Sequence, residues 1–252
     1  MNTQKTYTPP QPWSLIGDTF GGIAVSSLLV CVISGIVLAI PYQVSDPYLS
    51  LSQILLSNPS AVIARNLHYW SAQFFLVFTL IHMIDHFRIS RERELRIGPW
   101  FRLLISVFIV FYAMLSGFIL KGDADSEQAL LIFRSLFESI PLVGELLSQA
   151  LLGNTESYLL LYVNHISLAT IFIILILFEH ARVIWGKAIT FVIVLLFLLL
   201  LALFFQAPLH DNLNPVLKGP WYFLGLQEIL HWMSRPGWIW LIIMILFLPL
   251  IF

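Results

Sequence analysis

Long apolar runs are the feature that most constrains the fold of this 252-residue chain. A helix needs about 20 predominantly apolar residues to cross the hydrocarbon core of a bilayer. Five runs approach or exceed this length, at roughly 20–40, 68–87, 101–120, 158–185 and 188–206, and a sixth begins near Pro236 and is still apolar at Phe252. Only 11% of the residues are charged, whereas soluble domains carry about a quarter. The sequence therefore predicts an all-α integral membrane protein, a bundle of about five to six transmembrane helices.

The segment between the third and fourth runs has a different pattern. Residues 124–153 are amphipathic and are interrupted by Pro141 and Gly144. Proline and glycine commonly end a helix, and an amphipathic helix can lie in the plane of the membrane interface. We therefore predict two short amphipathic helices on the membrane surface between the third and fourth spans.

The arginines and lysines predict the orientation of the chain. The connection 88–102 carries five arginines, and short cytoplasmic loops are enriched in Lys and Arg. The N-terminus with Lys5 and the turn at 186–188 fall on the same side. We therefore expect a multi-pass protein of the cell inner (cytoplasmic) membrane, with its N-terminus cytoplasmic. The loops at 41–64, 121–157 and 207–236 would then face outward.

Two apolar runs each contain a pair of widely spaced histidines. His68 and His82 are fourteen residues apart, and His165 and His180 are fifteen apart. Fourteen residues of helix rise about 21 Å and return to nearly the same face. Two antiparallel helices would thus form two stacked bis-histidine sites, with His68 opposite His165 near the outer face and His82 opposite His180 near the inner face. Bis-imidazole ligation suits a haem that only transfers electrons, whereas zinc needs its ligands clustered.

Two other interpretations of these histidines stay open. A single histidine in a membrane helix is more often a hydrogen-bonded packing residue than a ligand. His86 also competes with His82, because the eighteen residues from His68 return to the same helix face. We prefer His82, since its fourteen-residue span matches the fifteen-residue span of the other run.

The stretch R-x-x-H-x-W-S-A at Arg65–Ala72, with a second histidine fourteen residues after the first, resembles helix B of the cytochrome b family. Members of this family are the dihaem subunits of quinol:cytochrome c and plastoquinol:plastocyanin oxidoreductases. The fifteen-residue spacing is similar to that of the chloroplast and Gram-positive branch. The resemblance implies two haem b cofactors held by the four histidines, and a quinone or quinol, which we expect to be menaquinone.

The resemblance also implies roles for small and basic residues. Gly21 and Gly35 match glycines that let haem approach the first helix, and Gly117 matches a glycine of the third. The family's second glycine on that helix is replaced by a leucine near position 103. Arg65 corresponds to a partner of a haem propionate, a role that suits the paired donors of guanidinium; the alternative is an arginine that extends to the membrane interface.

The outer quinol site of the family carries a Pro-Glu-Trp-Tyr motif, which this chain matches only in part. Trp221 and Tyr222 stand in the corresponding places, but Pro220 replaces the glutamate. Quinol oxidation releases protons and needs a base. Glu228 is the candidate substitute and His231 a second candidate, so we assign Glu228 and Tyr222 as quinol-site residues. The charged residues Lys121 and Asp123 also occur where the family is apolar.

These features together predict the function and the organisation of the chain. Residues 1–187 would form a dihaem four-helix core, and 188–252 would add C-terminal helices with the Pro-Trp-Tyr loop at 207–236. The protein would carry electrons across the membrane between quinone and an extramembranous redox partner, as the redox subunit of a quinol:electron acceptor oxidoreductase.

The expected partners follow from the same interpretation. The redox partner would be a Rieske iron–sulfur subunit or a c-type cytochrome, for which a multihaem protein is one option. We further expect contacts with other membrane subunits and with lipid, and none with nucleic acid. The complex would be oligomeric, and a dimer is one option. Two alternatives stay open: a dihaem membrane anchor of a dehydrogenase or hydrogenase, and a structural scaffold that retains haem without quinone turnover.

Overall fold

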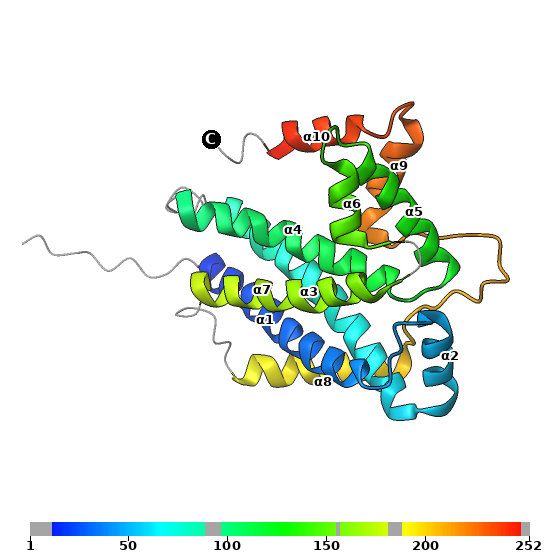
Figure 1. The fold of residues 1–252 in the computed structure, drawn as a ribbon. Coiled ribbons are helices and arrows are strands. Elements are labelled where there is room, and N and C mark those ends of the chain that lie inside the picture. The colour runs from blue at the N-terminus through cyan, green and yellow to red at the C-terminus, as the bar shows by residue number, and fades with distance from the viewer. Residues whose placement is uncertain (1–11, 89–96, 155–156, 181–187, 248–252) are drawn as a thin grey trace, which may run out of the picture. The chain divides into compact units, whose positions relative to one another are not determined.

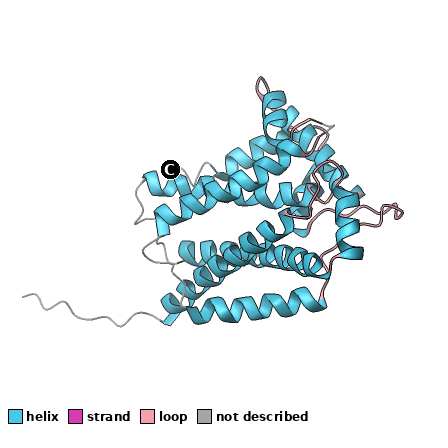
Figure 2. Cartoon of the chain, turned by 60° about the horizontal axis from the view of Figure 1, so that its bottom comes forward, coloured by secondary structure: helices cyan, strands magenta, loops and turns pink. Residues whose placement is uncertain are grey.

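The computed structural model describes residues 12–88, 97–154, 157–180 and 188–247, and their side chains except at 12–18, 176–180 and 246–247. These ranges hold helices joined by loops and contain no strand (Figure 2). The arginine-rich residues 89–96, the N-terminus with Lys5, the 186–187 turn and the end at Phe252 lie outside the described residues. The predicted orientation therefore stays a prediction.

The chain divides into two compact units, each of which is described by itself. The first unit takes in Met1–Leu38, Ile63–Trp100 and His180–Ala207, and the second takes in Ala39–Val62, Phe101–Glu179 and Pro208–Phe252.

The first unit is built on three long helices: α1 (Pro12–Ala39), α3 (Pro59–Arg88) and α8 (Ala188–Phe204) (Figure 1). Val30 of α1 and Val194 and Leu198 of α8 form a buried cluster, and Leu67, Trp70 and Phe74 of α3 pack against it. Polar side chains of α3 also bind the end of α8. The amide of Asn66 donates to Ala202 O (2.9 Å) and accepts from Ala207 N (2.9 Å).

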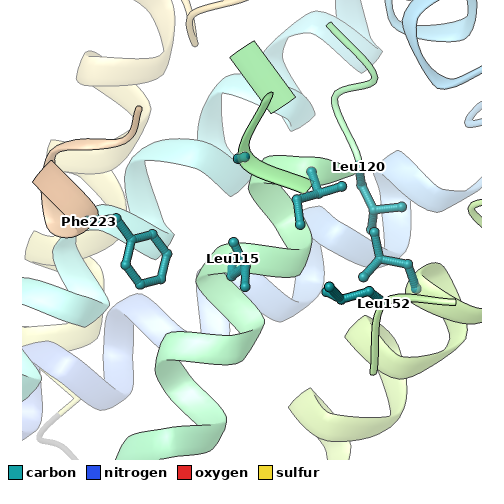
Figure 3. Close-up of a cluster of buried hydrophobic side chains, with 7 residues drawn as sticks. Leu115, Leu120, Leu152 and Phe223 are labelled. Carbon is teal, nitrogen blue, oxygen red and sulfur yellow. The ribbon is translucent and has the colours of Figure 1, made fainter. Parts of the chain in front are cut away.

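The second unit contains the other helices of the described residues. They are α2 (Pro47–Ser57), α4 (Ile97–Ile119), α5 (Ala124–Glu138), α6 (Gly144–Leu152), α7 (Leu159–His180), the 3₁₀ turn η2 (Trp221–Phe223), α9 (Leu224–Trp232) and α10 (Trp238–Phe247). Its core gathers side chains from distant segments around Leu115 of α4 (Figure 3). The other core residues are Ile119, Leu120, Ala129, Leu152, Leu161 and Phe223.

Several helices have the length and apolar character of membrane spans. In the described residues, three qualify over Thr19–Ala39, Pro59–Arg88 and Ile97–Ile119, and two shorter apolar helices run over Leu159–Leu175 and Ala188–Phe204. Large apolar side chains of α1, among them Ile33, Ile36 and Val37, are exposed on the protein surface, as expected where lipid is the solvent. The chain is an all-α membrane protein, as predicted, while its number of crossings stays a prediction.

The two short helices expected between the third and fourth spans are present. They are α5 and α6, which lie alongside each other (Figure 1). The break between them contains Pro141 and Leu142, whose φ is 70°. Gly144 then starts α6, where a Cβ would overlap Phe137 O. Their position on the membrane surface stays a prediction.

Two of the loops that are expected to face outward contain helices. The 41–64 loop contains α2, which begins with Pro47 after the N-cap Asp46; the Asp46 carboxylate accepts from Leu49 N (3.0 Å). The 207–236 loop contains η2 and α9. Both loops therefore contain regular helical structure.

Candidate functional site

Two histidines of α3 lie directly against two glycines of α1. A Cβ built on Gly35 would stand 2.9 Å from Cε1 of His68, and one on Gly21 would stand 2.9 Å from Cε1 of His82. Real Cβ atoms do not approach so closely, so any other residue would displace the imidazole. Because the glycines and the histidines are both fourteen residues apart, antiparallel α1 and α3 repeat the same contact at two depths.

The His68 ring has a second contact with α1, which defines its tautomer. His68 Nδ1 lies 2.8 Å from the carbonyl oxygen of Cys31 and 3.5 Å from the Cys31 thiol. A carbonyl oxygen can only accept, so Nδ1 carries the proton and donates it. In neutral imidazole the lone pair is then on Nε2, the nitrogen that ligates a metal in this tautomer.

His165 repeats this arrangement in the second unit, with a different acceptor. A Cβ on Gly117 of α4 would stand 3.0 Å from Cε1 of His165. The Nδ1 of His165 lies 2.9 Å from the Oγ of Ser116, the neighbour of that glycine. Three of the four predicted ligands thus lie against the three predicted glycines.

His180, the fourth predicted ligand, is placed less completely than the other three, whereas His86, the competitor of His82, is described. His180 is the last residue of α7, and its side chain lies outside the described residues. His86 lies one turn beyond His82 on α3, and its ring meets the His82 ring edge-on, with centroids 4.3 Å apart. In this arrangement His82 packs against the first helix, and His86 packs against His82.

Arg65 is buried within the first unit. Only 5% of its surface is exposed, and its guanidinium donates to Ala207 O (2.8 Å) just after α8. A guanidinium has five N–H donors. Arg65 is therefore a buried cation held by a backbone carbonyl, one turn before His68.

These residues fit a haem group on the structure alone. A porphyrin needs imidazoles that present Nε2, a helix backbone without side chains, and a cation for its propionates. The first unit provides His68 and His82 beside glycine and a buried Arg65, and the second unit provides His165 beside glycine. Nδ1 of His68 donates to a carbonyl oxygen, and Nδ1 of His165 lies 2.9 Å from a hydroxyl.

The quinol-site candidates lie in different surroundings within the second unit. Tyr222 packs against the core cluster, and its hydroxyl donates to Met114 O (3.2 Å). Trp221 is exposed beside it, after the N-cap Pro220. Glu228 lies on the exposed side of α9, where it accepts from Trp232 Nε1 (2.7 Å). It lines a shallow open depression with Leu224, Gly225, Gln227 and His231.

A buried ion pair holds the loop that leads to Tyr222. We call it the Asp123 clasp, formed by Lys121, Asp123, Ser126 and His210. The Asp123 carboxylate, 0% exposed, pairs with Lys121 Nζ (2.8 Å) and accepts from Ser126 N (3.0 Å) and His210 N (2.9 Å). At the start of α5, Ala124 N donates to the Asn212 side-chain oxygen (2.8 Å), and the Asp125 carboxylate accepts from Lys218 N (2.7 Å). The Asp123 clasp and these two bonds therefore fasten the 208–218 segment to α5.

An Asp123→Ala variant is expected to lose about 3 kcal/mol of stability, because it leaves the Lys121 ammonium buried without its counter-ion. Asp46→Ala is the matched control: it also removes an N-cap aspartate, but an exposed one, and should cost about 1 kcal/mol. Denaturant unfolding in detergent measures both. Equal losses in the two variants would show that the clasp is only a helix cap.

Comparison with known proteins adds an independent result. The family model described as cytochrome b/b6/petB matches residues 7–198, which is most of the chain. The chain is 25% identical over 152 residues to cytochrome b6 of Mastigocladus laminosus, covering 60% of this chain and 70% of that one. It is 24% identical over 202 residues to the cytochrome bc1 complex cytochrome b subunit of Corynebacterium diphtheriae, covering 70% of this chain but 36% of that subunit.

Among solved structures, the fold is similar to a chain of a structure titled "Hyperthermophilic respiratory Complex III". The TM-score is 0.64 at 18% identity, and the match covers 93% of this chain and 74% of the other. At this identity the likeness shows the fold alone.

Proposed function

Because the chain belongs to the cytochrome b family, we propose that it is the electron-transfer subunit of a quinol-linked oxidoreductase complex in the membrane. In this proposal electrons cross the membrane through two b-type haems, between quinone and an extramembranous redox partner. The observation that carries the proposal is the set of contacts between the predicted ligand histidines and the predicted glycines.

The chain's own residues would hold and orient the haems. His68 and His165 would ligate the outer iron, His82 and His180 the inner iron, and this pairing rests on the sequence spacing. When bound, haem supplies one-electron redox chemistry. Ligation by two neutral imidazoles would suit a haem that only transfers electrons. Gly21, Gly35 and Gly117 would let the porphyrin approach the helices, and Arg65 would bind a propionate.

Quinone would deliver or receive electrons from within the bilayer, and we propose menaquinone. At an outer quinol site, Tyr222 would orient the quinol, and Glu228 would accept a proton in place of the glutamate replaced by Pro220. The exposure of Glu228 supports this role, because a base facing water can release the proton it accepts.

The organisation of the complex is also part of the proposal. Two relatives are named as cytochrome b6 and as a subunit of the cytochrome bc1 complex, which supports a Rieske or c-type cytochrome partner, further membrane subunits and a dimeric assembly. The chain matches about a third of the bc1 subunit. We further propose the inner membrane, a cytoplasmic N-terminus, and the division into a 1–187 core and 188–252 helices.

The test is haem content and quinol reactivity of the full chain purified from membranes. Two haem b per chain are expected by pyridine haemochrome assay, and a menaquinol analogue should reduce them within the dead time of manual mixing. A chain that binds no haem contradicts the proposal. Haem that stays oxidised with quinol would instead favour the scaffold interpretation, which the replacement by Pro220 supports.

A Glu228→Gln variant tests the proton acceptor separately. The glutamine oxygen still accepts from Trp232 Nε1, so the local structure of α9 is kept while the charge is lost. Removing a general base costs about 10²- to 10⁴-fold in rate, so quinol-driven haem reduction should fall at least a hundredfold. The control is Glu145→Gln on α6, another exposed carboxylate, which should reduce at the parent rate. An unchanged rate in Glu228→Gln would remove Glu228 from the mechanism.

A further inference from the structure

Ser116 is a fully buried hydroxyl near the C-terminal end of the apolar helix α4. It is 0% exposed, and its Oγ has three polar neighbours. Two are backbone carbonyls of its own helix, Tyr112 O (2.8 Å) and Ala113 O (3.1 Å). The third is Nδ1 of His165 (2.9 Å), which belongs to α7.

The direction of the bond between Ser116 and His165 follows from counting protons. A hydroxyl has one proton and two lone pairs, and a carbonyl oxygen can only accept. The Ser116 proton is therefore donated to the carbonyls of the preceding turn. The Oγ lone pairs then accept from Nδ1–H of His165, so the lone pair of the neutral ring is on Nε2.

The acceptors for His165 and His68 differ in one respect that matters for experiment. His68 donates to a backbone carbonyl, that of Cys31, and no substitution of the cysteine side chain removes it. His165 donates to a side-chain hydroxyl, which a single substitution removes. Ser116 and Gly117 therefore have complementary roles on α4: the glycine makes room for the ring, and the serine accepts its proton.

We propose that Ser116 is a positioning residue for the outer haem: it holds His165 in the Nδ1–H tautomer and strengthens Nε2 as a ligand. This inference rests on the proposed function. An acceptor on the far nitrogen makes imidazole more basic, and a more basic ligand favours ferric over ferrous iron. Loss of the acceptor should therefore raise the midpoint potential of one haem and leave the other unchanged.

The test is a redox titration of both haems in the full chain carrying Ser116→Ala. A tenfold change in the ferric-to-ferrous preference corresponds to 59 mV for one electron, and a rise of about that size is expected for one haem. Ser116→Thr keeps the hydroxyl and should restore the parent potential. Ser116→Cys provides only a weak acceptor and should give an intermediate rise in the midpoint potential. This variant keeps the test possible if Ser116→Ala does not accumulate in the membrane.

Two controls separate this effect from a general disturbance of packing. Ser106→Ala removes another hydroxyl of α4 that donates to its own helix, at Leu103 O, and should leave both potentials unchanged. Cys31→Ala removes the thiol near His68 but keeps the carbonyl acceptor, and should do the same.

The outcomes distinguish this inference from the proposed function. Parent potentials for both haems in Ser116→Ala and in Ser116→Cys would overturn the positioning role while the function stands. A midpoint potential in Ser116→Thr that rises as far as in Ser116→Ala would also overturn the positioning role of Ser116. A parent chain without haem would contradict the proposed function itself.

Discussion

A His82→Leu variant is expected to bind one haem b instead of two, and a His86→Leu variant is expected to keep both. The two residues lie one turn apart on α3 and their rings touch, so each variant removes an imidazole from nearly the same place. The sequence alone allows either residue as the inner ligand, because both return to the face of His68. The contact that favours His82 is with Gly21, whose Cβ would stand 2.9 Å from the His82 ring.

His82→Leu is expected to lose this haem completely because a leucine side chain has no atom that can ligate iron. A haem at this site would lose one of its two ligands, and bis-imidazole spectra require both. Pyridine haemochrome measures haem per chain, and reduced-minus-oxidised spectra at low temperature identify which component is lost. The reverse result, with two haems in His82→Leu and one in His86→Leu, would transfer the ligand role to His86.

Helical periodicity is what made the histidines predictable, whereas the glycines were predicted from the resemblance to the cytochrome b family. Positions fourteen residues apart share a helix face whatever the rest of the chain does, and polar side chains at such positions are costly in a membrane span. The spacing therefore identified His68 and His82 as candidates, and the resemblance added Gly21 and Gly35. Their direct contacts were not predicted, because they depend on the register between α1 and α3.

Ser116 and Asp123 show what periodicity cannot identify. Ser116 resembles any small residue in an apolar run, and its role depends on His165, 49 residues later. Asp123 was noted as unusual, but its partner His210 is 87 residues away. Such contacts depend on tertiary packing, which the periodicity of residues along one sequence does not reveal.

The helix boundaries differ from the apolar runs for another reason. A hydropathy run marks the part of a helix that suits lipid, whereas the helix itself extends into polar residues that water can solvate. Accordingly α1 starts at Pro12 and α3 at Pro59, well before the runs at 20 and 68. The α2 helix was predictable, since an N-cap Asp followed by Pro at the first helical position is a helix start signal.

Gly21→Ala and Gly35→Ala are expected to remove one haem each, and not the same haem. Alanine in a helix interior is ordinarily more stable than glycine by about 0.5–1 kcal/mol, so these substitutions should favour the helix itself. The added Cβ, however, would stand 2.9 Å from Cε1 of His82 or of His68. The ring must then move away from the position that its neighbours define, and the porphyrin meets a methyl group on the helix that it should approach.

Gly22→Ala is the matched control, because it makes the same substitution on the same helix one residue later. Its Cβ would have Thr190 Cγ2 as its nearest neighbour, at 3.8 Å, which is an ordinary contact. This variant should keep both haems and unfold at the same or a higher denaturant concentration. The spectral component lost in Gly21→Ala should be the one lost in His82→Leu, since both act on the same ring. If Gly21→Ala and Gly22→Ala bind equal amounts of haem, the α1 glycines do not serve the haem sites, and the contacts that support the proposed function reflect helix packing only.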